Sequence, residues 1–184
     1  MSSNQTNAQP KKLFEPANRE ELLRGWLLHA HKCRDRQELA ARRNDTYHYW
    51  LGVPTIIFAT VVGSSVFASL DAQVDTWFKI ILGMVSITSA VLAGLQTFYN
   101  FAGRAEIHRV TGIKYKGMIR ELEQLLTGSS RQLPEEPNFL NDLRQRLDDM
   151  ELEAPVVADS VYRLVEERYN HVELEDKVAA FVRE

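Results

Sequence analysis

Two long uncharged stretches dominate the pattern of apolar and polar positions, one over residues 46–70 and the other over residues 80–103. A surface helix of a soluble protein returns to charge every three or four residues, because only one of its faces is buried. Neither stretch does so. A helix of about 22 residues is roughly 33 Å long, enough to cross a hydrocarbon core of about 30 Å. The pattern therefore predicts transmembrane helices at residues 49–70 and 80–103.

The rest of the chain has the spacing of amphipathic helices, without a strand pattern. Asn18 is the predicted N-cap of the first helix, with Glu20 and Glu21 in its first turn, and Pro54 predicts a modest kink in the first span. The predicted fold class is all-α, an integral membrane helical hairpin extended by cytosolic helices. Its segments are a flexible N-terminus (1–17), a cytosolic helix leading into the membrane (18–48), the two spans (49–70 and 80–103) with an extracytoplasmic connector (71–79), a cytosolic extension (104–127) and acidic C-terminal helices (138–184).

Lysine and arginine gather on one side of the two spans. Five lie in residues 30–48 and five in residues 104–120, whereas the connector holds only Lys79. The positive-inside rule therefore predicts a multi-pass protein of the inner (plasma) membrane with both termini in the cytoplasm. Up to residue 134 the chain has 16 basic and 11 acidic residues, and from 135 onward 6 and 14. The acidic tail is expected to point into the cytosol or to dock on a basic surface of a partner.

Each span carries a stripe of small residues at steps of four positions, which would permit close approach of helix backbones. These candidate packing positions are Thr55, Ala59 and Gly63 in the first span and Ser86, Ala90 and Gly94 in the second. Chance is the alternative explanation, because small residues are frequent in membrane helices.

The second span also has a polar strip formed by Ser89, Ala93, Gln96 and Asn100. A polar strip in hydrocarbon must face protein or water. Two helices cannot enclose a pore, so a water-lined strip requires several copies of the hairpin around an axis. The alternative is that Gln96 and Asn100 form hydrogen bonds across the hairpin near the inner interface.

The chain offers no catalytic constellation and predicts no cofactor. The segment at residues 29–33 puts His29 and Cys33 on one helical face and His31 on the other, so at most two metal ligands are expected to converge, and we predict no metal site. Nucleic-acid binding is not predicted either, because the basic residues flank the spans and do not alternate with stacking aromatics.

The order of these features resembles the SLATT domains, two-transmembrane effectors associated with nucleotide-second-messenger synthases and SLOG sensor domains in bacterial conflict systems. The resemblance covers residues 20–170 and includes "YHYWLGVPTIIFATVVGSSVFA" and the segment after the second span, where His108 and Tyr115 have the spacing found in the family. These two residues share a helical face and are expected to brace neighbouring helices.

The resemblance implies a non-enzymatic effector that oligomerises and perforates or depolarises the inner membrane when an upstream sensor is triggered. Its expected partners are membrane lipid, further copies of the chain, and a sensor protein or a nucleotide second messenger. Two alternatives stay open: a non-conducting membrane scaffold that recruits a cytosolic partner through its helical tail, and a soluble helical interaction module. The sequence does not give the number of subunits or the activating signal.

Overall fold

The computed structural model describes residues 16–68, 75–127 and 138–170, and every regular element in these ranges is an α-helix. The predicted all-α class is therefore confirmed for this part of the chain. Residues 1–15, 71–74 and 171–184, on which parts of the predicted N-terminus, connector and tail fall, lie outside it. The helices are α1 (Arg19–Ala68), α2 (Thr76–Tyr99), α3 (Phe101–Thr127), α4 (Phe139–Glu153) and α5 (Asp159–Asn170).

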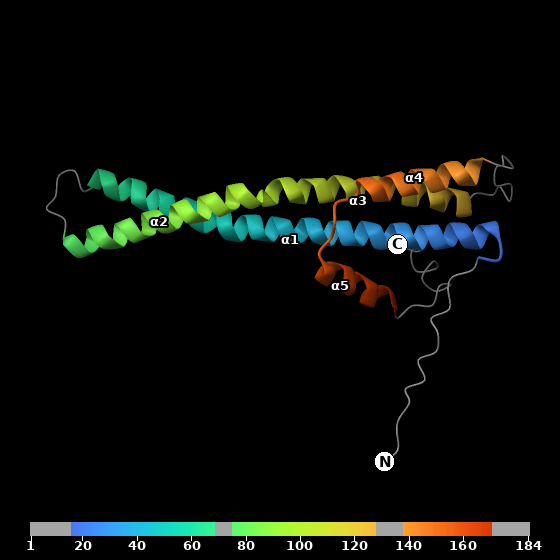
Figure 1. Ribbon diagram of the computed structural model, residues 1–184, viewed down its shortest axis with the longest axis horizontal. Coiled ribbons are helices and arrows are strands. Elements are labelled where there is room, and N and C mark those ends of the chain that lie inside the picture. Colours follow the sequence, from blue (N-terminus) through green and yellow to red (C-terminus); the bar gives the residue numbers. More distant parts are fainter. Residues whose placement is uncertain (1–15, 69–74, 128–137, 171–184) are drawn as a thin grey trace, which may run out of the picture.

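The first helix is a single rod of 50 residues along which the rest of the chain is arranged (Figure 1). Its start is fixed as predicted: the Glu21 amide donates to Asn18 Oδ1 at 2.8 Å, and the Ala17 amide donates to Glu21 Oε2 at 2.7 Å. These two bonds satisfy amides that a helix start leaves unpaired. The helix continues through Pro54, so the cytosolic helix and the first uncharged stretch form one element, as expected.

The second uncharged stretch is divided between two helices at Asn100, which the sequence pattern did not predict. Asn100 adopts the left-handed conformation, with φ 44° and ψ 50°, and its amide donates to the Gln96 carbonyl at 3.1 Å. Its Oδ1 accepts from the Gly103 amide at 3.3 Å and so caps the start of α3. A Cβ at Gly103 would lie 2.5 Å from Asn100 Nδ2, so a larger residue there would displace the asparagine side chain from this cap.

The break falls inside the predicted second span, whose bounds as a membrane segment stay a prediction. We predicted one helix over residues 80–103, whereas α2 begins at Thr76 and ends at Tyr99. The helix includes four residues that we had assigned to the connector. Asparagine tolerates the left-handed conformation better than most residues, which explains why the break falls at Asn100. Figure 1 shows α2 and α3 following one another along α1 in the opposite direction.

The hydrophobic core lies in the half of the molecule built from α1, α3 and α4. Tyr115 and Leu122 of α3 are almost completely buried against the N-terminal half of α1, and Leu143 and Leu147 of α4 cover them from outside. The face of α4 that carries Leu143 and Leu147 is thus the one turned toward the core. The core cluster comprises Leu23, Leu27, Ala30, Cys33, Tyr115, Met118, Ile119, Leu122, Leu143 and Leu147.

The last described helix, α5, docks on α1 through buried apolar side chains, Val161 and Val165, and through charge. Glu166 pairs with both Lys32, at 3.0 Å, and Arg36, and the Tyr169 hydroxyl donates to Asp35 Oδ2 at 2.7 Å. Arg36 also lies over the Tyr162 ring, 4.0 Å from its centroid. Part of the acidic segment, α5, therefore lies against basic residues of its own chain.

Candidate functional site

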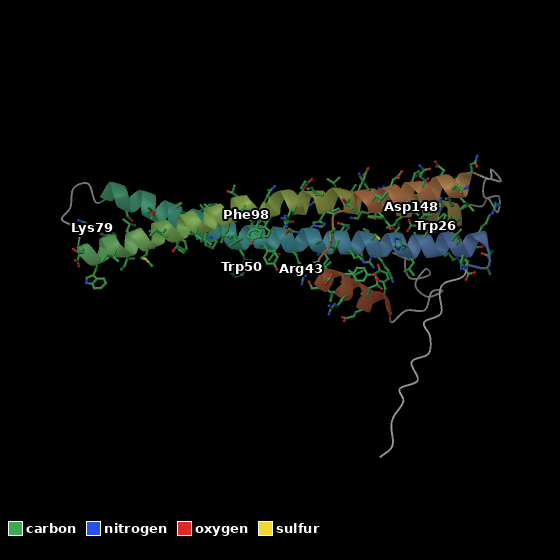
Figure 2. All side chains as sticks on the ribbon, in the orientation of Figure 1. Trp26, Arg43, Trp50, Lys79, Phe98 and Asp148 are labelled. Atoms are coloured by element: carbon green, nitrogen blue, oxygen red, sulfur yellow. The ribbon has the colours of Figure 1, made fainter. Side chains whose placement is uncertain are left out.

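The C-terminal part of α1 and all of α2 form a pair of helices with a largely uncovered apolar surface. Trp50 of α1 and Phe98 of α2, both labelled in Figure 2, are 76% and 80% exposed. Within the described residues, one helical segment, Thr76–Thr127, contains a stretch long and apolar enough to cross a membrane, and Ser89 is the single buried residue of its α2 part. Monomeric soluble proteins rarely leave so large an apolar surface in water.

The six predicted packing positions are not packed together within the chain. Ala59, Gly63, Ser86, Ala90 and Gly94 are exposed, and a Cβ at either glycine would meet no atom within 4 Å. Thr55 is the exception, since it is half-buried and its carbonyl faces α2. The role of these stripes in helix packing stays a prediction, and the exposed positions lie open to a neighbouring molecule.

Two residues of the polar strip make hydrogen bonds within the hairpin, and the other two are exposed. Ser89 is buried and its hydroxyl donates to the Thr55 carbonyl at 3.4 Å, while Gln96 Nε2 donates to His48 Nδ1 at 3.3 Å. Ala93 and Asn100 are exposed. In the single chain, Gln96 thus makes the cross-hairpin bond that we weighed as an alternative, and the pore-lining role of the strip stays a prediction.

A buried polar contact joins α1 to α3 just beyond the uncharged stretches. His108 Nδ1–H donates to Gln37 Oε1 at 2.6 Å, and Tyr115, two turns further along α3, is buried next to Cys33. The two residues that carry the family resemblance therefore both face α1. Burial, and then the positive charge of Arg104, lower the pKa of His108, which favours the neutral imidazole at this buried position.

We expect acid to weaken the packing of α1 on α3 at His108. Because its pKa is lower in the folded chain than in the unfolded one, unfolding takes up a proton below the ordinary histidine pKa of about 6.5. The contribution of neutral His108 to the free energy of unfolding is therefore complete above a pH of about 6.5 and declines as the pH falls below that value. Thermal unfolding of the full chain in detergent should show this decline, and His108→Asn should reduce it. If the stability of His108→Asn declined with pH as that of the wild type does, His108 would not be the group responsible.

The docking of α5 depends on Glu166, whose carboxylate is three-quarters buried between two cations. Burial acts to raise the pKa of Glu166, but hydrogen bonds from Lys32 and Arg36 outweigh it and lower that pKa. Glu166→Gln should cost about 1–3 kcal/mol of docking free energy, because it leaves both cations without their charged partner. Faster amide hydrogen exchange in α5 would report the release, with Glu167→Gln, at an exposed neighbour, as control. Equal exchange in both variants would contradict the role of Glu166.

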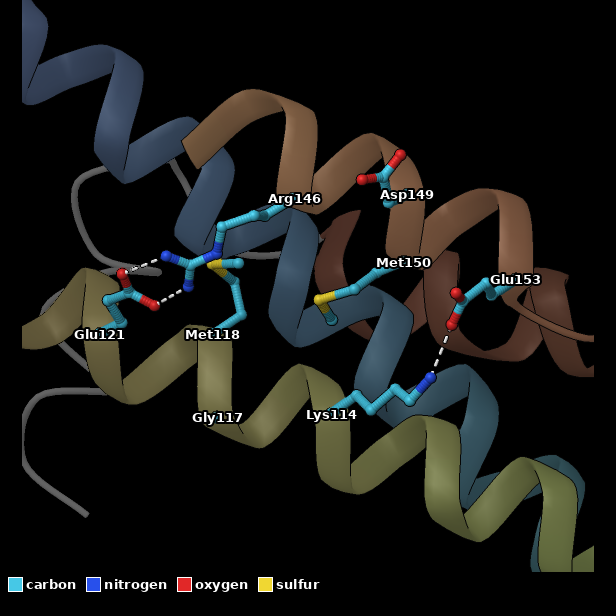
Figure 3. Close-up of a pocket in the computed structure, with 8 residues that line it drawn as sticks. All are labelled: Lys114, Gly117, Met118, Glu121, Arg146, Asp149, Met150 and Glu153. Carbon is cyan, nitrogen blue, oxygen red and sulfur yellow. Dashed lines mark hydrogen bonds and ion pairs between the residues drawn. The ribbon is translucent and has the colours of Figure 1, made fainter. Parts of the chain in front are cut away.

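A surface groove of about 510 Å³ lies between α3 and α4 (Figure 3). The two basic side chains that line it are both paired with carboxylates. Lys114 Nζ lies 2.6 Å from Glu153 Oε2, and Arg146 forms a bidentate salt bridge with Glu121. Positive charge that is already neutralised gives an anionic ligand such as a nucleotide little electrostatic attraction. The groove therefore adds no support to the expected nucleotide partner.

A smaller cavity of about 260 Å³ brings together residues that are far apart in the sequence. His29 and Cys33 of α1 meet Glu151 of α4, and the ligand atoms of all three lie within 4.8 Å of one another. Hydrogen bonding to Cys33, opposed by burial and assisted by Glu151, raises the pKa of His29 to about 9. The expectation that at most two ligands converge here is thus wrong, because Glu151 supplies a third.

A scan against protein-family models, a search of curated proteins and a search of solved structures each found no match for this chain. The function of the chain is therefore inferred from the arrangement of its own residues.

Proposed function

We propose that this protein is a two-pass membrane effector. Its hairpin oligomerises and forms a pore in the bilayer, or disrupts it, under the control of the cytosolic helices. The observation that carries the proposal is the division of the molecule into two unlike halves. One half has a packed core and a charged surface, and the other exposes apolar side chains such as Ile56 and Ile87. Lipid is the environment that suits the second half.

The two-pass topology is supported by the length of the uncharged end of α1 and by its antiparallel neighbour. The hydroxyls on this part of α1 do not require water, because Thr60 and Ser65 each donate to a carbonyl one turn earlier. Such back-bonding satisfies hydroxyls inside a bilayer. The basic residues on the core side of the hairpin support a topology with both termini in the cytoplasm, by the positive-inside rule.

Assembly of several copies is supported by the small residues that the single chain leaves exposed. Ala59, Ala90 and Gly94 would let the backbones of neighbouring hairpins approach closely. Contacts between copies would then bring exposed polar positions of the strip to a common axis. The resemblance to SLATT domains adds the biological setting, an effector that a sensor activates in a bacterial conflict system.

The control step would be a shift between two packings of the cytosolic helices. The ion pairs of Glu166 hold α5 on α1. A partner that binds the released helix more tightly than the docked one would shift the chain toward the open packing. The same docked helix also supports the second candidate, a non-conducting scaffold whose tail recruits a cytosolic protein.

The decisive experiment combines membrane extraction with a potential-sensitive dye. The full chain is expressed at increasing levels in a bacterial host, because assembly of copies depends on concentration. We expect a carbonate-resistant membrane fraction and a loss of membrane potential that grows with expression. Stable insertion with unchanged potential at every level would exclude the pore and favour the scaffold, whereas a fully soluble chain would contradict both.

Gly94→Leu is expected to block assembly without affecting the fold of the single chain. The added side chain meets no atom of its own chain, but it would hold a neighbouring backbone away. Cross-linking in membranes should show loss of oligomers, and the dye should show retained potential. Gly117→Leu is the matched control, because it is equally uncovered but lies on α3 in the charged half. Unchanged oligomers in Gly94→Leu would rule out assembly through this stripe.

A further inference from the structure

We propose that His29, Cys33 and Glu151 bind a divalent transition-metal ion of the zinc class, which ties α4 to α1. The three residues are 122 positions apart at most and meet only because α4 folds back over the first helix. This inference is independent of the membrane function, since the cluster lies in the charged half of the molecule.

The distance between the side chains of His29 and Cys33 already suits a bound metal ion. His29 and Cys33 are one turn apart, and His29 Nε2 lies 3.5 Å from Cys33 Sγ. A tetrahedral zinc ion with ordinary bond lengths holds a nitrogen and a sulfur ligand about 3.5 Å apart. Glu151 contacts the same imidazole nitrogen with Oε1, so a small rearrangement of exposed side chains would admit an ion between them.

The donor set selects the kind of ion. A thiolate and an imidazole disfavour calcium and magnesium, which take oxygen ligands, and suit zinc, which takes sulfur, nitrogen and carboxylate oxygen together. The thiolate and the carboxylate would offset the charge of a divalent ion. Three protein ligands would leave a fourth coordination position for water or another ligand. Pro155 and Val157 line the same cavity as the three ligands.

The residues around the cluster are compatible with a thiolate at Cys33 and a divalent ion beside it. Cys33 is buried, with the hydroxyl of Tyr115 as a neighbour that can donate to a thiolate. Arg36 also lines the cavity, but its guanidinium is engaged by Glu166 and lies over the Tyr162 ring. Its positive charge is therefore partly neutralised before an ion enters.

The test uses the full chain in detergent, purified without a polyhistidine tag and dialysed against micromolar zinc or cobalt. We expect one ion per chain, and with Co²⁺ the charge-transfer absorption of a thiolate ligand. Glu151→Gln should weaken metal binding by at least about 10- to 100-fold, which is the loss that even an outer-shell change produces. Because the Glu151 side chain is 48% exposed, this variant should fold normally. Cys33→Ser should abolish the charge-transfer absorption.

The matched control is Glu153→Gln, which removes an exposed carboxylate two residues away in the same helix. Wild-type affinity in this variant, beside weakened binding in Glu151→Gln, would support the site. A metal-free wild-type chain after dialysis would overturn the proposal. Equal affinities in the two glutamine variants would overturn it as well, because Glu151 would then not be a ligand.

Discussion

Ile87→Arg is expected to prevent stable insertion of the hairpin into the membrane. Ile87 lies near the middle of α2, and its side chain is 64% exposed. Arginine at the centre of a membrane helix costs about 2.5–3.5 kcal/mol on the insertion scale, where isoleucine is slightly favourable. The change therefore shifts the insertion equilibrium by roughly a hundredfold or more. The measurement is the fraction of full-length chain that stays in the membrane pellet after carbonate extraction.

Ile113→Arg provides the matched control for this prediction. Ile113 is 56% exposed, so the two positions are similar in a single chain in water. It lies on α3 beside Lys114, where an additional arginine remains solvated. We expect the control to pellet like the wild type. If both arginine variants remained equally in the membrane pellet, α2 would not be the part of the chain that meets lipid.

Local signals in the sequence were sufficient for the helices and for several of their ends. Asn18 begins α1 because its side chain accepts an amide of the first turn, a bond between residues three positions apart. The face of α4 was predictable for a similar reason, since Leu143 and Leu147 recur at the helical period and both are buried. Features that depend on near neighbours can thus be found from composition and spacing.

The break at Asn100 shows where such signals fail. Asparagine is common in helices as well as in turns, and the apolar pattern continues on both sides of it. The left-handed turn becomes recognisable only when Asn100 is considered with Gly103, whose missing Cβ gives the asparagine side chain its space. An Asn-x-x-Gly spacing within an apolar run is the signal that would have predicted it.

The candidate cluster at Glu151 could not be predicted from the sequence at all. His29 and Cys33 are visible as a pair one turn apart, but the third ligand comes from α4, and nothing in the sequence fixes how α4 lies on α1. The same holds for Glu166, one of many acidic residues in its segment, which is distinguished only by the two cations beside it. Contacts between distant helices depend on packing that local patterns do not encode.

Leu122→Ala is expected to destabilise the charged half of the molecule by about 2–5 kcal/mol, the usual cost of truncating a fully buried leucine. The Leu122 side chain has no exposed surface and lies in the cluster that joins α1, α3 and α4. Its removal leaves a cavity that the surrounding helices can only partly close. Thermal or denaturant unfolding of the full chain in detergent, followed by circular dichroism, measures the loss.

Leu152→Ala is the matched control. It also truncates a leucine to alanine, but the side chain of Leu152 is 85% exposed, so no buried contact is lost. This control should unfold within about 0.5 kcal/mol of the wild type. Both variants should remain in the membrane pellet, because neither changes the uncharged stretches. A destabilised charged half that stays in the membrane would show that core packing and insertion depend on different residues. Equal stability of the two alanine variants would contradict the assignment of Leu122 to a packed core.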